Sequence, residues 1–349
     1  MAFATTSRPR AAKVKGLLGL ATALSFGLAV TGCSAAEDGK GKEGSATEQL
    51  NIVATTNVYG DIASSVAGEH GKVSSIISNA AQDPHSYEAT AKDKLAISKA
   101  DVVIINGGGY DYFAEQIIED LGGKAPTVVK SFEGEGHSHD HGHDHGEEGH
   151  DHDHGEEGHD HDHGHEGHSH EHGENEHVWY DLDHMEEFVG EVGEALAKAD
   201  PDNAKTYEEN ASKLAKEISD VTDSEDFKAA EKMLKGKSFM MTEPVPEALL
   251  DELGMEDGTP EGLSSAVEAG QEIPALVIKR AEDSLKQGKV QLFAFNSQTA
   301  DPQTKKLYES AKKAGVPTVD VTETIPEGKT FVEWMKDNVA AIAKAVDAK

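Results

Sequence analysis

Residues 101–129 read DVVIINGGGYDYFAEQIIEDLGGKAPTVV. The apolar run at 101–107 predicts a strand, the pattern at 110–121 predicts a helix, and residues 126–129 predict another short strand. A strand, a helix and a second strand in succession are typical of a βαβ unit, in which the two strands lie parallel. This stretch therefore indicates an α/β fold built on a parallel sheet.

The same alternation continues on both sides of this stretch. The length, 349 residues, is sufficient for two domains. Further strands are predicted at 50–55, 72–78, 237–242, 290–295 and 316–321. Further helices are predicted at 58–68, 87–100, 181–199, 245–254, 274–288, 301–315 and 330–346. We therefore expect two Rossmann-like lobes with parallel sheets, an N-terminal lobe at 48–200 and a C-terminal lobe at 236–349.

The segment 201–235 separates the two predicted lobes and has the pattern of one long helix. It begins with a proline, which a helix tolerates in its first turn. Its apolar residues recur at intervals of three and four and mark one face: Tyr207, Ala211, Leu214, Ile218 and Val221. A helix of roughly thirty residues is about 45 Å long. We expect this segment to join the lobes as a single rigid helix that permits only small lobe movements.

Residues 1–32 have the pattern of a signal peptide. Basic residues precede an apolar run at 16–30, which is too short to span a membrane comfortably. The run ends in VTGCS, and small residues directly before Cys33 resemble a bacterial lipobox, in which the cysteine is lipid-modified and begins the mature chain. A plain signal peptide with an incidental cysteine is the alternative. Cys33 is also the only cysteine, so no intramolecular disulfide can form.

Residues 33–47 are small and polar, as expected of a flexible tether. No later segment is long and apolar enough to cross a membrane. We therefore expect an extracytoplasmic protein that is lipid-anchored to the cell membrane.

The chain is strongly acidic, with a formal net charge of -33 from 32 basic and 65 acidic residues. Such a charge repels nucleic acid, so no nucleic-acid partner is expected. It attracts cations, although part of the excess lies in a single segment, the histidine-rich loop at 133–176.

The histidine-rich loop has glycine at short intervals and little to bury, so we predict that it is disordered. Its neutral imidazoles would bind metal ions weakly at neutral pH and release them in acid. We interpret it as an accessory metal loop that captures or senses zinc beside a tighter site; a passive buffer is the alternative. It holds fifteen of the 19 histidines: His137, His139, His141, His143, His145, His150, His152, His154, His159, His161, His163, His165, His168, His170 and His172.

Four polar residues stand where a tighter site is expected. Ligands of open α/β sheets bind beyond the carboxyl ends of the strands. His85, Glu243 and Asn296 each follow a predicted strand, and His177 closes the histidine-rich loop. Imidazole and oxygen ligands together suit zinc. Each residue also has a simpler explanation. His85 could be a surface histidine and Glu243 a helix N-cap. Asn296 could be a turn residue, and His177 could be only the last member of the histidine run.

Several motifs together resemble one family, the metal-binding lipoproteins that serve zinc and manganese ABC importers. The resemblance covers the chain from about residue 48 onward and includes the lipobox. It is carried by DPHSYEAT (83–90), the acidic histidine loop, EHVWYDL (176–182), DPDNAKTYEEN (200–210) and VTETIPEGKTFVEWM (321–335). It implies two α/β lobes joined by one rigid helix, with a metal ion in the cleft between them.

The resemblance also implies a ligand set. PHSYE places a ligand at His85 and EHVWYD places a second at His177. The third family position is often a histidine, but MTEPVPEALLDELG offers Glu243. The fourth is usually Asp or Glu, but FAFNSQT offers Asn296, a weaker neutral donor. These departures leave zinc and manganese both open; the histidine-rich loop favours zinc.

The resulting expectation is a monomeric binding protein that captures a divalent metal ion, zinc first and manganese second, and delivers it to an ABC permease and its ATPase. Two other classes stay as alternatives. A zinc hydrolase would need an open zinc position and a general base, but the sequence contains no HExxH, GxSxG or P-loop motif. A surface adhesin that uses the metal structurally is the other.

Overall fold

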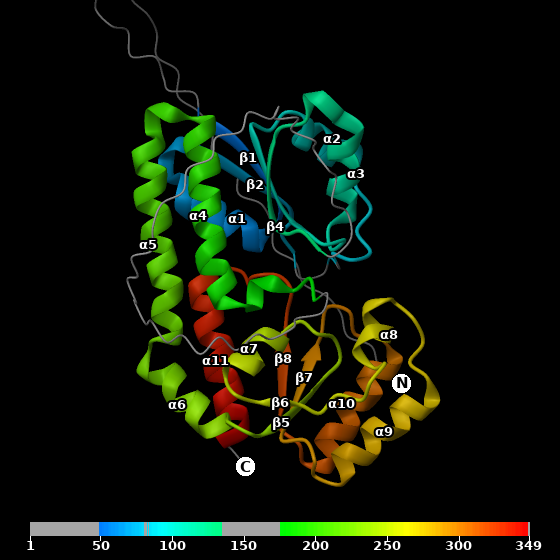
Figure 1. Ribbon diagram of the computed structural model, residues 1–349. Coiled ribbons are helices and arrows are strands. Elements are labelled where there is room, and N and C mark those ends of the chain that lie inside the picture. Colours follow the sequence, from blue (N-terminus) through cyan, green and yellow to red (C-terminus); the bar gives the residue numbers. More distant parts are fainter. Residues whose placement is uncertain (1–48, 80–81, 83, 135–174, 348–349) are drawn as a thin grey trace, which may run out of the picture. The chain divides into compact units, whose positions relative to one another are not determined.

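The computed structural model describes residues 49–79, 82, 84–134 and 175–347. The predicted signal peptide and tether, the lipidation residue Cys33 and the fifteen histidines of the histidine-rich loop lie outside these ranges. Residues Thr47–Lys349 belong to one compact unit. It contains two four-stranded parallel sheets (Figure 1), which confirms the predicted α/β class with parallel pairing.

The first sheet precedes the histidine-rich loop. Its strands lie in the order β2 (Gly71–Ile77), β1 (Leu50–Thr56), β3 (Val102–Gly107) and β4 (Thr127–Phe132). The intervening helices are α1 (Asn57–Ala67), α2 (Ala91–Ser98) and α3 (Tyr112–Leu121), with the 3-10 turns η1 (Gly68–His70) and η2 (Gly122–Lys124). Every residue of β3 is buried, which explains the unbroken apolar run at 102–105.

The second sheet has strands in the order β6 (Glu256–Asp257), β5 (Ser238–Met241), β7 (Leu292–Asn296) and β8 (Thr318–Val321). Its helices are α7 (Glu247–Glu252), α8 (Ser264–Glu268), α9 (Ala275–Lys286), α10 (Pro302–Ala314) and α11 (Phe331–Asp347). The two-residue strand β6 and the five-residue helix α8 were not predicted, because such short elements carry no hydrophobic period.

The two sheets share one topology. In each sheet the first strand lies between the second and the third, so the strand order reverses direction beside the first strand. Ligands of open parallel sheets bind at such a switch point, beyond the carboxyl ends of the strands. In the second sheet the switch point lies between the ends of β5 and β7, which brings Glu243 and Asn296 together.

The segment between the lobes differs from the single helix expected at 201–235. After α4 (Leu182–Ala199) it contains the 3-10 turn η4 (Pro201–Asn203), helix α5 (Ala204–Thr222) and helix α6 (Glu225–Leu234). The break has a local cause: the Ser224 hydroxyl accepts a hydrogen bond from the Phe227 amide and so begins a new helix. The apolar face predicted for this segment is confirmed, since all five of its residues are buried in α5.

A continuous hydrophobic core joins the parts of this unit. Ile52 of β1, Leu214 of α5 and Phe239 of β5 all belong to one buried cluster. Helices α4 and α5 lie side by side (Figure 1) and contact each other along their length. The Asn57 side chain also donates to the Ile325 carbonyl at 2.8 Å and accepts from the Ile325 amide at 3.0 Å. These contacts hold the ends of the two sheets in a defined arrangement.

Among the described residues, no helix combines the length and the apolar character that a membrane span requires.

Candidate metal centre

The two histidines predicted as ligands lie next to each other. His85 lies in the loop between β2 and α2, and His177 directly precedes the 3-10 turn η3 (Val178–Tyr180). Their ring centroids are 5.4 Å apart, and the Tyr110 ring packs edge-on against both. The Asn106 side chain, near the end of β3, donates to the Glu176 carbonyl at 3.0 Å. The first sheet thus fixes the backbone beside His177.

Two carboxylates complete a compact cluster with these rings. His85 Nε2 lies 3.3 Å from Glu323 Oε2 and 3.4 Å from Glu268 Oε1. His177 Nε2 lies 3.9 Å and 3.7 Å from the same two oxygens. The side chains of His177 and Glu323 are fully buried, whereas those of His85 and Glu268 keep 18% and 19% exposure. Two imidazole nitrogens and two carboxylates from distant parts of the sequence therefore converge on one point.

Glu323 lies in the loop that follows β8. Its Oε2 accepts a hydrogen bond from the Tyr110 hydroxyl at 3.0 Å, and its Oε1 accepts one from Asn296 Nδ2 at 2.7 Å. The Gln298 side chain accepts from its backbone amide. The carboxylate is thus oriented by residues of both lobes.

Glu243 and Asn296 meet at the switch point of the second sheet, as expected. Asn296 Nδ2 donates to Glu243 Oε2 at 2.6 Å and also to Glu323 Oε1, so one amide group bridges two carboxylates. The Thr299 hydroxyl donates to the same oxygen of Glu243. Asn296 Oδ1 instead accepts from the Gln298 amide at 3.0 Å. Asn296 therefore presents a nitrogen to the cluster, whereas the sequence suggested an oxygen ligand.

Sequence reasoning missed Glu268 and Glu323. Glu323 stands two residues after a predicted strand, inside the motif VTETIPEG, so the rule that selected Glu243 and Asn296 also pointed to it. Glu268 is the last residue of the short helix α8, and no pattern in the sequence marks it.

The pKa values of the two histidines are shifted in opposite directions. Burial lowers the pKa of His177 to about 3, so its ring is neutral. Burial also lowers the pKa of His85, but the hydrogen bond to Glu323 and the charges of Glu323, Glu268 and Glu176 raise it to about 9.

Burial and neighbouring charges shift the pKa values of the three carboxyl groups. Burial raises the pKa of Glu268 to about 8, and the nearby Glu176 adds to the shift while His85 opposes it. Burial and the charge of Glu323 raise the pKa of Glu243 to about 7. Burial alone would raise the pKa of Glu323, but its hydrogen bonds to His85 and Asn296 and the charge of His85 outweigh burial, so its pKa is lowered. A divalent cation would offset this concentration of negative charge.

The cluster fits a metal ion geometrically. One ligand atom each of His85, His177 and Glu268 lie within 4.8 Å of one another. Metal–ligand bonds of about 2.0–2.2 Å arranged tetrahedrally place the ligand atoms roughly 3.3–3.6 Å apart, close to the 3.3–3.9 Å separations above. His177 Nε2 and both Glu268 oxygens are buried and have no hydrogen-bond partner among the described residues. A bound cation would satisfy these atoms.

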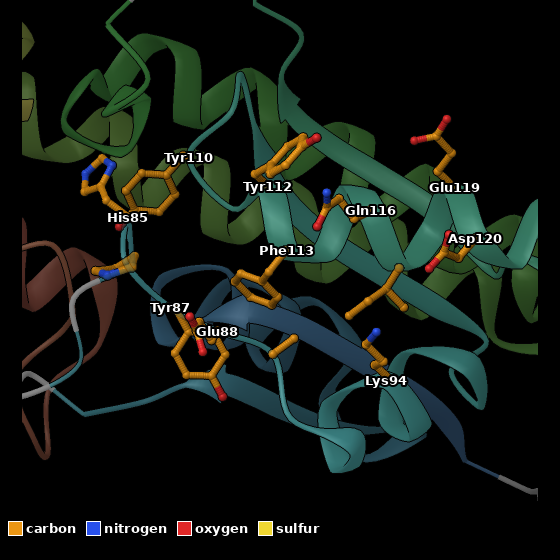
Figure 2. A pocket seen from close by; sticks show the side chains of 13 residues that line it. His85, Tyr87, Glu88, Lys94, Tyr110, Tyr112, Phe113, Gln116, Glu119 and Asp120 are labelled. Carbon is orange, nitrogen blue, oxygen red and sulfur yellow. The ribbon is translucent and has the colours of Figure 1, made fainter. Parts of the chain in front are cut away.

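A cavity of about 450 Å³ runs away from the cluster along α3. Figure 2 shows His85 and Tyr110 at one end of it and Glu119 and Asp120 at the other. Only the end lined by His85 and Tyr110 touches the metal-ligand cluster, so the cavity is adjacent to the centre and is not the centre itself.

The fold and the centre define a metal-binding solute-binding protein, and comparison with known proteins identifies its family. The family model described as "zinc-uptake complex component A periplasmic" matches residues 52–345, so the chain belongs to that family. Its members are extracytoplasmic solute-binding components of metal ABC transporters and are not enzymes.

Related proteins align with this chain over nearly its whole length. The chain is 26% identical to the manganese ABC transporter substrate-binding lipoprotein scaA of Streptococcus gordonii, covering 91% of this chain and 96% of the relative. It is 28% identical to the manganese ABC transporter substrate-binding lipoprotein PsaA of Streptococcus mitis, covering 87% and 92%. The periplasmic zinc-binding protein TroA of Treponema pallidum has the same fold, with a TM-score of 0.64 at 17% identity over 85% of this chain and 99% of that chain.

Proposed function

We propose that this chain captures a divalent metal ion outside the cytoplasm through His85, His177, Glu323, Glu268 and Glu243, and delivers it to an ABC permease and its ATPase. The observation that carries the proposal is the convergence of two histidine Nε2 atoms with the Glu268 and Glu323 carboxylates at 3.3–3.9 Å. Glu243 is held beside them through Asn296. Asn296 acts as a bridge between carboxylates and not as a ligand, because its oxygen is engaged by the Gln298 amide.

We assign zinc as the transported ion. Two neutral-nitrogen donors with carboxylate oxygens are a common zinc ligand set, and the fifteen histidines of the loop add imidazole groups shortly before His177 in the sequence. Manganese is the second candidate for two reasons. Three glutamates surround the two histidines, and hard oxygen ligands suit manganese; the relatives scaA and PsaA also carry manganese in their names.

The remaining parts of the proposal concern residues outside the described ranges. We infer that Cys33 carries the lipid anchor and that residues 33–47 form the tether. We also infer that the histidine-rich loop stores metal ions close to the centre and raises their local concentration. The protein acts as a monomer in this scheme.

Uptake of radiolabelled metal tests the transport function. Cells that lack this chain should take up zinc slowly from nanomolar solution, and the wild-type chain should restore uptake. The variants His85→Ala and His177→Ala should not, although they reach the cell surface in normal amounts. Restoration of manganese uptake in place of zinc would change the assigned ion. Normal uptake of both ions by the deletion cells would refute the proposed function.

A further inference from the structure

Asn175 lies two residues before His177 and contacts two parts of the centre at once. Its Oδ1 accepts a hydrogen bond from the His177 backbone amide at 3.1 Å and lies 2.9 Å from His177 Nδ1. Its Nδ2 donates to the Pro244 carbonyl and to Glu247 Oε2, both at 2.9 Å. One side chain therefore uses both ends of its amide group.

These partners fix which end of the amide faces which way. A backbone amide can only donate, so the atom facing His177 N must be the oxygen. A backbone carbonyl can only accept, so the atom facing Pro244 O must be the nitrogen. A flipped Asn175 would place two donors together on one side and two acceptors together on the other.

The fixed orientation determines the tautomer of His177. The Asn175 oxygen cannot donate, so the Nδ1 atom that faces it must carry the hydrogen. The ring is buried, and an imidazole that carries its one hydrogen on Nδ1 leaves Nε2 with a free lone pair. That atom lies 3.7 Å from Glu268 Oε1 and 3.9 Å from Glu323 Oε2, on the side where a metal ion would bind.

The other end of Asn175 connects His177 to the second sheet. Pro244 directly follows Glu243, and Glu247 begins helix α7. Helix α7 also contacts the 3-10 turn η3, which follows His177. Asn175 thus links a ligand beside the first sheet to the loop that carries a carboxylate of the second.

We propose that Asn175 is the positioning residue of this centre, which holds His177 in the Nδ1–H tautomer and fixes its ring against the Glu243 loop. The proposal rests on the proposed metal-binding function. Outer hydrogen bonds of this kind orient metal-binding histidines in general, and their loss typically weakens metal binding about 10- to 100-fold.

Three variants test this role. Asn175→Ala removes both ends of the amide. Asn175→Asp combined with Glu247→Gln keeps an oxygen that faces His177 Nδ1 and avoids two adjacent carboxylates, although it gives up the hydrogen bond to the Pro244 carbonyl. Asn210→Ala is the matched control, because Asn210 also makes a side-chain bond between elements, to the Val66 carbonyl at 3.0 Å, but away from the centre.

The first measurement is the ring-nitrogen NMR spectrum of His177 in the metal-free protein, and the second is the affinity for zinc and for manganese by chelator competition. We expect Nδ1–H in the wild type, the control and the double variant, and an Nε2–H population in Asn175→Ala. Affinity should fall about 10- to 100-fold in Asn175→Ala and return to within a few-fold of the wild type in the double variant.

Two results would overturn the proposal. One is an unchanged tautomer and affinity in Asn175→Ala. The other is a double variant that matches Asn175→Ala in both measurements, since the oxygen would then have no role. If Asn175→Ala does not fold, the double variant still tests the proposal: it should keep the Nδ1–H tautomer and bind metal within a few-fold of the wild type. If the wild type binds neither zinc nor manganese, the proposed function fails, whereas the tautomer measurement still tests the orienting role of Asn175.

Discussion

Glu268 contributes a carboxylate at the boundary between the centre and solvent. Its two oxygens have no hydrogen-bond partner among the described residues, yet its side chain keeps 19% exposure. It also lines a cavity of about 520 Å³ together with Glu176 and Glu247. A cation that enters through this acidic cavity would meet Glu268 before the buried Glu323 and His177. We therefore expect Glu268 to contribute to binding as a ligand from the rim.

The variant Glu268→Gln should weaken binding of both ions, because it removes one negative charge and one strong oxygen donor. Manganese affinity should fall more than zinc affinity, since manganese depends more on hard oxygen ligands. Loss of an outer partner of a ligand already costs about tenfold or more, so we expect a loss of at least about tenfold for manganese when the ligand itself is changed, measured by chelator competition. The exposed Glu272, four residues further on, supplies the control Glu272→Gln. Unchanged affinities in Glu268→Gln would remove Glu268 from the ligand set.

The role of Asn296 as a bridge between carboxylates can be tested by the stability of the metal-free protein. Its amide donates to both Glu243 and Glu323, so Asn296→Ala leaves two buried carboxylates without this donor. The loss should lower the free energy of unfolding by about 2–3 kcal/mol, the usual effect of hydrogen bonds to charged groups. Urea unfolding at neutral pH, after metal removal, measures it. A variant with wild-type stability but strongly weakened metal binding would instead indicate that Asn296 is itself a ligand.

At the scale of the elements, the break between α5 and α6 depends on one hydroxyl. The Ser224 side chain accepts from the Phe227 amide at 3.1 Å and begins α6. Ser224→Ala should lower the free energy of unfolding by about 1 kcal/mol, as for other N-caps. Ser212, exposed in the middle of α5, provides the control Ser212→Ala, which should be neutral or slightly stabilising. Equal stability of the two variants in thermal unfolding would argue against the cap.

Helix α7 carries a carboxyl group whose titration opposes folding. Burial, and then the charges of Asp183, Asp181 and Glu231, raise the pKa of Glu252 from 4.5 to about 8. The folded chain therefore binds this proton more tightly than the unfolded chain. Its contribution to stability is fully present below pH 4.5 and is lost as pH rises to about 8.

Glu252→Gln should remove this pH dependence. Each unit of pKa shift corresponds to about 1.4 kcal/mol, and solvent screening at this partly exposed position reduces the effect. We expect the variant to gain about 1–2 kcal/mol over the wild type near pH 9 and almost nothing near pH 5. Denaturant unfolding across this range measures the difference, with the exposed Glu256→Gln as control. A gain that does not depend on pH would contradict the assigned cause.

The sequence predicted the longer elements because their hydrophobic patterns are strong. The buried strand β3 and the amphipathic face of α5 are examples: β3 lies within its predicted range, and all five residues predicted for the face are buried. The break at Ser224 was missed because an N-cap inside a helical pattern is a local hydrogen-bond effect. Glu268 was missed because its position depends on the path of residues 258–274 around the second sheet. The orientation of the Asn296 side chain depends on three partners: Glu243 and Glu323, which lie far from it in the sequence, and the Gln298 amide, which follows β7.

At the scale of the whole molecule, one hydrophobic cluster contains residues of both sheets and of helices α4, α5 and α11. Moving the sheets apart would expose part of this core, which costs roughly 25 cal/mol for each Å² of apolar surface. The break at Ser224 does not interrupt the cluster, because Val221 of α5 and Phe227 of α6 both belong to it. We therefore expect metal release to require only local movement around the centre.

The metal centre is tested most directly by a calorimetric titration of the metal-free protein with residues 137–172 deleted, beside the same protein with His85→Ala. We predict one tight equivalent of zinc in the deletion protein, weaker manganese binding, and loss of the tight site in His85→Ala. This result would establish the cluster of His85, His177 and the glutamates as the binding centre. A deletion protein without any tight site, or one that keeps its site after His85→Ala, would contradict this assignment of the binding centre.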